Sequence, residues 1–316
     1  MRQACSKIRK TKEGEREAVA ATKIKKSKDN FLFNLFVYGF LILALIVVLY
    51  PLYFVLIASI SDPYMVLRGD VTWLPKGITF DSYKKIFANA DIWIGYANSI
   101  KYTVIGTFLS VTLTVCLAYP LSRKYFCLRK PISLIVLITM YFSGGMVPTY
   151  ILVSKLGLRN TIWSIILVGV VSAYNVIIAR TFFESNIPTE LEEAAEIDGC
   201  SKGKFFFYFV PQLSKAILAV LTLYYAVAYW NDYMKGLLYI DKSSLYPLQI
   251  VLRGILIETQ SLANDFADVN QIEAKMKLAE SMKYGTIVVA IIPPLILYPI
   301  VQKYFEKGVM IGSIKG

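Results

Sequence analysis

The chain has 316 residues, of which 56% are hydrophobic and only 18% are charged, and its mean hydropathy is +0.53. Soluble globular domains carry about a quarter charged residues, so this composition excludes an ordinary soluble protein and indicates a multi-pass membrane protein. The formal net charge of +12 does not indicate nucleic-acid binding, because ten of the 34 Lys and Arg residues lie within residues 1–28, ahead of the first apolar run.

Six apolar segments are each close to or beyond the roughly 20 residues that a membrane-spanning helix needs. They lie at residues 32–59, 98–121, 131–153, 161–183, 205–229 and 284–303. Because basic segments stay on the cytoplasmic side, the N-terminus is expected inside, and six crossings return the C-terminus to the cytoplasm. The basic loop 122–130 then also falls inside. We therefore predict an all-α polytopic membrane protein with six transmembrane helices.

The remaining segments divide the chain into a membrane domain with two tails. Residues 1–30 form a basic cytoplasmic tail that is expected to lie on anionic lipid, residues 31–305 form the transmembrane domain, and residues 306–316 form a cytoplasmic C-terminal tail. Two long loops, 60–97 and 230–283, fall outside. The second contains an apolar patch at 245–252, which is either a re-entrant helix of the core or a docking surface; we favour docking.

An acidic segment at 188–199 lies on the cytoplasmic side, between the fourth and fifth spans. Pro188 and Gly199 are residue types that open and close helices, and Thr189 and Glu192 have capping-box spacing. A helix of this length is about 15 Å long and cannot cross a bilayer. One face carries mostly small residues, at i, i+3, i+4 and i+7: Leu191, Ala194, Ala195 and Asp198. Taken alone, a solvated acidic loop is the simpler interpretation.

The sequence carries no group that would let this chain catalyse a reaction or convert energy alone. Histidine, the usual general base, is absent, and the cysteines have no C-x-x-C spacing. No Gly-x-x-x-x-Gly-Lys-Ser/Thr phosphate loop occurs, and no carboxylate lies at the midplane of a span, where proton- or sodium-coupled carriers usually need one. We expect no catalytic residue, metal or cofactor in this chain, and therefore an external energy source. The alternatives are a stand-alone secondary carrier or facilitator and a membrane-embedded enzyme.

The acidic segment also carries a family motif. Glu193-Ala194-Ala195-Glu196-Ile197-Asp198-Gly199, two spans before the C-terminus, resembles the EAA motif of permease subunits in binding-protein-dependent ABC importers. Five further segments resemble the carbohydrate, maltose-type branch, within it the group for larger oligosaccharides: 118–123, 142–149, 230–233, 244–249 and 302–308. The resemblance thus covers nearly the whole chain.

The resemblance implies a type I ABC importer permease fold in a bacterial cytoplasmic membrane, and a set of partners. These are a second permease in a heterodimer, two ATPase subunits that bind ATP and Mg, and an extracytoplasmic sugar-binding protein. The EAA helix docks on an ATPase and couples its closure to alternating access. On this reading Glu193 makes the polar contact, Ala194 and Ala195 allow close approach, and Asp198 and Gly199 shape the exit turn.

The sequence departs from the family pattern behind this helix. The family usually has a proline thirteen residues after the motif's glycine and another four residues later, and here those positions are Gln212 and Ala216. The nearest proline is Pro211. We expect the kink entering the fifth span to be shifted by one residue.

A sugar pathway needs aromatic faces and amide groups in the outer half of the bundle. The candidates are Asn98, Tyr141, Asn175, Tyr225, Tyr229, Trp230 and Asn231. For the aromatic residues the alternative is packing or an interfacial position, and for the asparagines it is interhelical hydrogen bonding. Gly144 and Gly145, followed by Pro148, either allow close helix packing or form a hinge in the gate.

Overall fold

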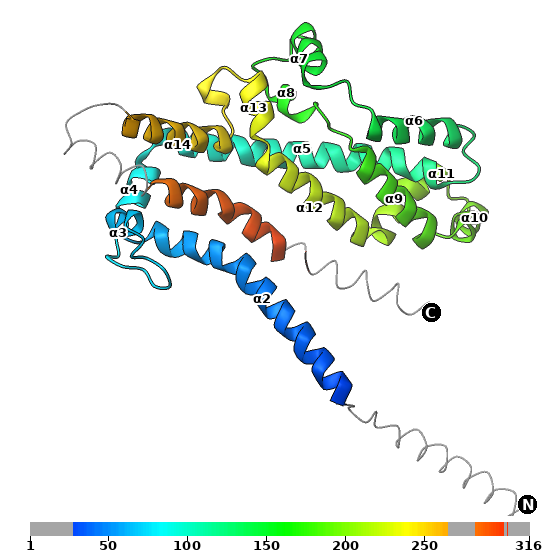
Figure 1. Cartoon of the computed structure of the whole chain (residues 1–316). Helices are drawn as coiled ribbons and strands as arrows, with labels where there is room; N and C mark the ends of the chain where they lie inside the picture. Colours follow the sequence, from blue (N-terminus) through cyan, green and yellow to red (C-terminus); the bar gives the residue numbers. More distant parts are fainter. Residues whose placement is uncertain (1–27, 265–281, 300–301, 303–316) are drawn as a thin grey trace, which may run out of the picture. The chain divides into compact units, whose positions relative to one another are not determined.

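A computed structural model describes residues 28–264, 282–299 and 302, and every regular element among them is helical (Figure 1). The chain divides into two compact units, residues 1–54 and 55–316. The first unit contains most of α2 (Lys28–Ser59), an apolar helix of 32 residues interrupted only by Pro51. At about 48 Å, α2 exceeds the roughly 30 Å of a hydrocarbon core. The predicted C-terminal tail and part of the loop 230–283 lie outside the described residues.

The second unit consists of short and long helices in sequence. They are α3 (Pro63–Leu67), α4 (Asp81–Ala88), α5 (Ala90–Ser122), α6 (Arg129–Tyr141), α7 (Met146–Lys155), α8 (Ile162–Ile166), α9 (Ala173–Asn186), α10 (Thr189–Ile197), α11 (Lys202–Leu213), α12 (Lys215–Asn231), α13 (Tyr233–Tyr239), the 3₁₀ turn η1 (Ser243–Leu245), α14 (Leu248–Asn264) and a further helix, Met282–Pro299.

The second unit is built around α5, which contacts α12, α9 and α14 along its length (Figure 1). One buried face of α5 carries mostly small residues, with the large Tyr102 among them; the small ones are Gly95, Ser99, Gly106, Ser110, Thr114 and Ala118. Small residues let membrane helices approach closely. At Gly106 the approach is so close that an added Cβ would lie 2.6 Å from the ring of Tyr229 on α12.

Two apolar clusters fill the spaces around α5. The first joins α5 to α9, α11 and α12 through residues that include Leu121, Phe183, Phe205 and Leu221. The second joins α4, α5, α12, α14 and the Met282–Pro299 helix through Ile86, Ile92, Trp230, Leu248 and Val289. These clusters fix both ends of α5.

Three of the six predicted spans are interrupted in the structure. Among the described residues, three helices are long and apolar enough to cross a membrane: Phe33–Ser59, Ala90–Ser122 and Met282–Pro299. The predicted span 131–153 is the pair α6 and α7, bent by 114°, and 205–229 is the pair α11 and α12, bent by 79°. The predicted span 161–183 is interrupted between α8 and α9.

Glycines explain two of these interruptions. Gly145, before α7, has a φ of +85°, and Gly169, between α8 and α9, has a φ of +74°. A positive φ is incompatible with a right-handed helix and is readily adopted only by glycine. The length of an apolar run does not indicate such a change in backbone direction.

The backbone of the α8–α9 interruption is satisfied by two tyrosines of α12. The Tyr229 hydroxyl donates to the Ile166 carbonyl at 2.8 Å, and the Tyr225 hydroxyl accepts from the Ser172 amide at 3.0 Å. On α5, the same hydroxyls pair with Ser110 Oγ at 3.0 Å and Thr114 Oγ1 at 2.7 Å. Irregular backbone is tolerated at membrane depth when protein groups satisfy it, and here the tyrosines do so.

The apolar patch at 245–252 is not the docking surface that we favoured. Leu248 is fully buried and Leu252 is 3% exposed, and both belong to the core cluster around α14. The Leu248 amide donates to Ser99 Oγ at 2.8 Å, and an added Cβ at Gly95 would lie 3.0 Å from Leu248 Cα. From Leu248 onward the patch is therefore part of a core helix, α14, that packs on α5, which is the alternative left open.

Candidate functional site

The acidic segment forms α10, a nine-residue helix about 14 Å long. Its C-terminal end has the expected glycine turn: Gly199 has a φ of +81°, its amide donates to the Glu196 carbonyl at 3.0 Å, and the Cys200 amide donates to the Ala195 carbonyl at 2.8 Å. This hydrogen-bond pair is a Schellman motif. The predicted capping box is absent, because the N-cap is Pro188 and no side chain caps this end.

One side of α10 is exposed. It carries two carboxylates, a small residue and a large apolar one, at i, i+3, i+4 and i+7: Glu190, Glu193, Ala194 and Ile197. Ile197 is 87% exposed, the highest exposure of any large apolar side chain in the part of the chain that the structure describes. Asp198 is also exposed, whereas Ala195 packs against the apolar cluster behind the helix. We call Glu190, Glu193, Ala194 and Ile197 the exposed stripe.

The opposite side of α10 is held by a buried ion pair. Glu192 Oε2 lies 3.6 Å from Arg123 Nε, and the two side chains are 4% and 2% exposed. Arg123 follows the last residue of α5, and it also donates from one terminal nitrogen to the Ile187 carbonyl at 2.9 Å. Its guanidinium lies over the Tyr119 ring, 4.6 Å from the centroid. Arg123 thus connects the end of α5, the end of α9 and the back of α10.

Tyr125 completes this anchor. Its hydroxyl donates to Glu192 Oε1 at 2.5 Å, while its ring lies under the Lys202 ammonium, 3.8 Å from the centroid. Tyr125 is 52% exposed, but burial of its hydroxyl end, together with the hydrogen bond to Glu192, raises the pKa of Tyr125 above its ordinary value. Lys202 also pairs with Glu196 at 3.4 Å and opens α11. The anchor therefore joins α10 to the end of α9 through Arg123 and to the start of α11 through Lys202.

The chain bends again behind this anchor, at the position where the family prolines are missing. The bend between α11 and α12 is centred on Ser214, which is fully buried and lies between Gln212 and Ala216. Pro211 remains inside α11, three residues earlier. The kink is therefore not shifted by one residue as expected, because Pro211 does not end the helix. Ser214 Oγ is buried and makes no hydrogen bond with any described group.

The predicted hinge glycines lie at the sharper of the two bends. Gly144 and Gly145 separate α6 from α7, an added Cβ at either would meet no atom within 4 Å, and Pro148 lies in the first turn of α7. Close helix packing therefore does not explain this glycine pair in the structure of this chain. A role as a gate hinge stays a prediction.

Most of the predicted sugar-pathway residues make polar contacts inside the subunit. Tyr225 and Tyr229 pair with α5, Asn98 donates to the Ser244 and Tyr246 carbonyls at 2.9 and 3.1 Å, and Trp230 donates to the Ala290 carbonyl at 3.1 Å. Asn175 is 5% exposed. Tyr141, 73% exposed, and Asn231, also exposed, remain accessible in this chain. Sugar contact by any of the seven stays a prediction.

Comparison with known proteins identifies the family. The family model described as "Binding-protein-dependent transport system inner membrane component" matches residues 92–311. The chain belongs to this family. It is 39% identical over 287 residues to the polygalacturonan/rhamnogalacturonan transport system permease protein YtcP of Bacillus subtilis, covering 91% of this chain and 99% of that protein. It is 28% identical over 298 residues to the arabinooligosaccharides transport system permease protein AraQ of Halalkalibacterium halodurans, covering 93% and 100%.

A solved structure agrees with this assignment. A bacterial ABC transporter involved in the import of the acidic polysaccharide alginate contains a chain that matches with a TM-score of 0.79 and 31% identity, covering 88% of this chain and 98% of that one. The ABC importer permease fold that the EAA motif predicted is thereby confirmed. The chain is a membrane-embedded permease of a binding-protein-dependent importer, a translocation subunit rather than an enzyme.

Sequence reasoning missed the residues that hold α10 in this permease. Arg123 was counted among the basic residues of a cytoplasmic loop, and Glu192 was assigned to a capping box. The available signal was the i, i+4 pair of Tyr119 and Arg123, which places a guanidinium over an aromatic ring. The Tyr119–Arg123 spacing does not indicate that Glu192 is the carboxylate that pairs with Arg123.

Proposed function

We propose that this permease is one half of the membrane channel of an ATP-driven oligosaccharide importer, and that α10 receives the movement of an ATPase subunit. The partners are a second permease, two ATPases that bind ATP and Mg, and an extracytoplasmic sugar-binding protein. Both termini lie in the cytoplasm. The observation that carries the proposal is a short helix that is exposed on one side and anchored on the other by the buried Arg123–Glu192 pair.

The exposed stripe has the chemistry of a docking surface. Glu193 and Glu190 offer carboxylates to a basic partner, Ala194 lets a partner backbone approach, and Ile197 supplies an apolar anchor at the end of the helix. Interfaces are commonly organised in this way, with a buried apolar contact surrounded by charged groups that orient the partner. Ala195 contributes to the packing behind the helix and not to the docking face.

The anchor gives a physical route for the movement. A force applied to the exposed stripe passes through Glu192 to Arg123, and so to α5, the longest helix of the second unit. The same force reaches α11 through the Glu196–Lys202 pair. Because breaking a buried pair by removing one partner costs about 3–5 kcal/mol, α10 is expected to move with α5 and not independently of it.

Oligosaccharides are the substrate class that the relatives favour. The named substrates of the two relatives above are polygalacturonan or rhamnogalacturonan and arabinooligosaccharides, and the solved transporter imports alginate. Within this permease, Tyr141 and Asn231 are the accessible candidates for sugar contact. We infer an oligosaccharide cargo, and we place uronate-containing oligosaccharides first in any screen of ligands.

Charge reversal on the exposed stripe tests the proposal. Glu193→Lys is expected to abolish ATP-dependent uptake in proteoliposomes containing the whole importer, and to prevent the ATPase from co-purifying with the permease, while membrane insertion is unchanged. Asp91→Lys is the matched control, because Asp91 is an exposed carboxylate at the opposite end of α5 and should transport normally. Wild-type uptake by Glu193→Lys would refute the coupling role. Solute movement by the single chain without ATP would instead establish a stand-alone carrier.

A further inference from the structure

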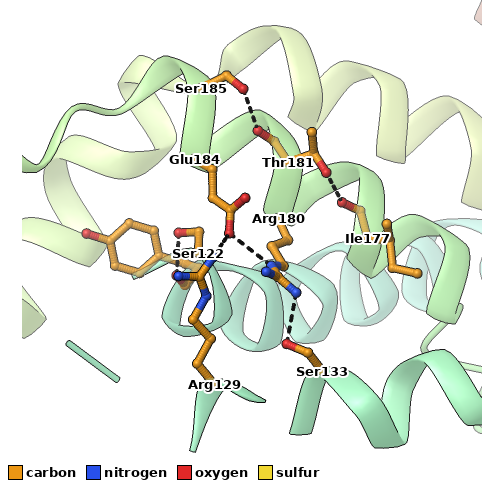
Figure 2. Close-up of polar contacts among 9 residues, drawn as sticks. Ser122, Arg129, Ser133, Ile177, Arg180, Thr181, Glu184 and Ser185 are labelled. Carbon is orange, nitrogen blue, oxygen red and sulfur yellow. Dashed lines mark hydrogen bonds and ion pairs between the residues drawn. The ribbon is translucent and has the colours of Figure 1, made fainter. Parts of the chain in front are cut away.

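A cavity of about 850 Å³ opens between α6 and α9. Its lining comes from the α5–α6 loop, the first three turns of α6 and the middle of α9: Lys124, Phe126, Cys127, Arg129, Lys130, Ser133, Leu134, Leu137, Ile177 and Arg180. Figure 2 shows the polar contacts of two of the lining residues, Arg129 and Arg180. Its volume is in the range of small-molecule sites, which span about 300–1,000 Å³.

The mouth of the cavity is strongly basic. Four of its lining residues are Lys or Arg, and no acidic residue lines it within the described part of the chain. Glu184 Oε1 pairs with both Arg129 and Arg180, and Arg180 also donates to Ser133 Oγ at 2.9 Å (Figure 2). Four positive charges and one negative charge leave a net +3.

The two guanidinium groups are held in place by these contacts, with further N–H groups left to donate. Arg129 and Arg180 have side chains only 26% and 28% exposed, so each is fixed at the wall of the cavity and is not a freely moving surface group. Lys124 and Lys130 are exposed and form no ion pair with any described residue. Arg groups held in this way bind phosphate through paired hydrogen bonds, and free lysines add charge.

The cavity becomes apolar along α6 and α9. Leu134 and Leu137 lie one and two turns beyond Lys130 on α6, and Ile177 lies about one turn before Arg180 on α9. On both helices the cations therefore lie closer to the α10 side than the apolar side chains do, by about 5–10 Å. The cavity thus has a charged end and an apolar end.

We propose that this cavity binds an anionic phospholipid, with its phosphate between Arg129, Arg180 and the two lysines, and an acyl chain along Leu134, Leu137 and Ile177. Basic pockets between membrane helices on the cytoplasmic side attract anionic headgroups, and long basic side chains reach the interface while their stems lie in hydrocarbon. An anionic sugar would satisfy the charges but would leave the leucines facing a polar ligand. The site requires this end of the permease to lie at the cytoplasmic membrane surface, but it does not depend on the cargo or on ATPase docking.

Lipid binding to the purified permease complex in mild detergent, followed by native mass spectrometry, tests this site. Phosphatidylglycerol is expected to bind more tightly than phosphatidylcholine of the same chain length, and the preference should shrink as salt rises. Lys124→Gln with Lys130→Gln is expected to weaken phosphatidylglycerol binding about 25-fold, since each basic residue near an anionic lipid contributes about fivefold. Binding of phosphatidylcholine and the thermal unfolding midpoint should not change.

Two controls separate the possible ligands. Lys204→Gln removes an exposed lysine of α11 outside the cavity and should leave phosphatidylglycerol binding unchanged. Glycerol 3-phosphate, which has the phosphate but no acyl chain, should bind far more weakly than the lipid. Equal binding of the two phospholipids, or an unchanged affinity in the double variant, would overturn the proposal. Displacement of phosphatidylglycerol by an oligogalacturonate at equal concentration would overturn it in favour of an anionic sugar.

Discussion

Removing the Glu192 carboxylate tests whether α10 is anchored as described. Glu192→Ala leaves the Arg123 guanidinium buried without its counter-charge and leaves the Tyr125 hydroxyl without an acceptor. Breaking a buried ion pair from one side costs about 3–5 kcal/mol. Because the pair connects α10 to α5 and does not lie in the main core, we expect the cost to appear as local opening of residues 187–200.

Hydrogen exchange of the α10 amides measures this opening. A loss of about 3 kcal/mol corresponds to exchange about a hundredfold faster, since each 1.36 kcal/mol is a factor of ten. Amides of the α5–α12 contact should be unaffected. Glu190→Ala is the matched control, because Glu190 lies on the same helix in the exposed stripe, and an exposed substitution typically changes stability by less than about 0.5 kcal/mol. Equal exchange in the two variants would show that the buried pair does not hold the helix.

A double substitution shows whether the opening of α10 in Glu192→Ala comes from the lost contact or from the buried, unpaired charge of Arg123. Replacing both partners, Arg123→Met with Glu192→Leu, removes the pair without leaving either charge buried. Apolar replacements of buried ion pairs are often neutral, so the double variant is expected to protect α10 better than Glu192→Ala does. If instead it exchanges at least as fast, the uncompensated Arg123 charge is not the cause of the opening.

Three further substitutions test single contacts. Tyr125→Phe should destabilise α10 by about 1 kcal/mol by removing the hydrogen bond to Glu192. Because burial raises the pKa of that hydroxyl, it stays protonated up to its ordinary pKa of about 10, so the difference from wild type in hydrogen exchange should be constant from neutral pH up to about pH 10. Gly106→Ala should lower the free energy of unfolding by about 1–3 kcal/mol through overpacking, whereas Gly203→Ala, whose Cβ meets nothing within 4 Å, should not lower it. Gly145→Ala should cost about 1–3 kcal/mol in the same assay, because its φ of +85° and ψ of 173° suit only glycine; the same change at the preceding glycine should cost less.

The sequence alone predicts the family and the position of the short docking helix, but not the contacts that hold this helix. The motif Glu193 to Gly199 predicted a short helix with a glycine turn, and the turn formed as expected because it depends on one local backbone conformation that glycine supplies. The membrane class followed from composition alone, which requires no knowledge of packing. A glycine turn depends on local residues, and the membrane class depends on the composition of the whole chain. Both can therefore be predicted without a structure.

What the sequence did not predict depends on long-range contacts. Glu192 does not cap α10, because its carboxylate binds Arg123 and Tyr125, which lie more than 60 residues earlier in the chain. The sequence predicts a kink at the start of the fifth span, but the bend lies at Ser214 and not at Pro211, which stays inside α11. Asn98, a candidate ligand in the sequence, is partly buried and hydrogen-bonds to a segment almost 150 residues away, a contact that the sequence does not indicate.

The paired tyrosines of α12 limit how this permease can change shape. Tyr225 and Tyr229 each bridge α5 and the α8–α9 interruption, so sliding α12 by one turn, about 5.4 Å, would break four hydrogen bonds together. We therefore expect α5, α12 and the α8–α9 segment to move together as a rigid body. The α6–α7 and α11–α12 bends carry no comparable brace among the described residues, so we expect a transport cycle to flex at these bends.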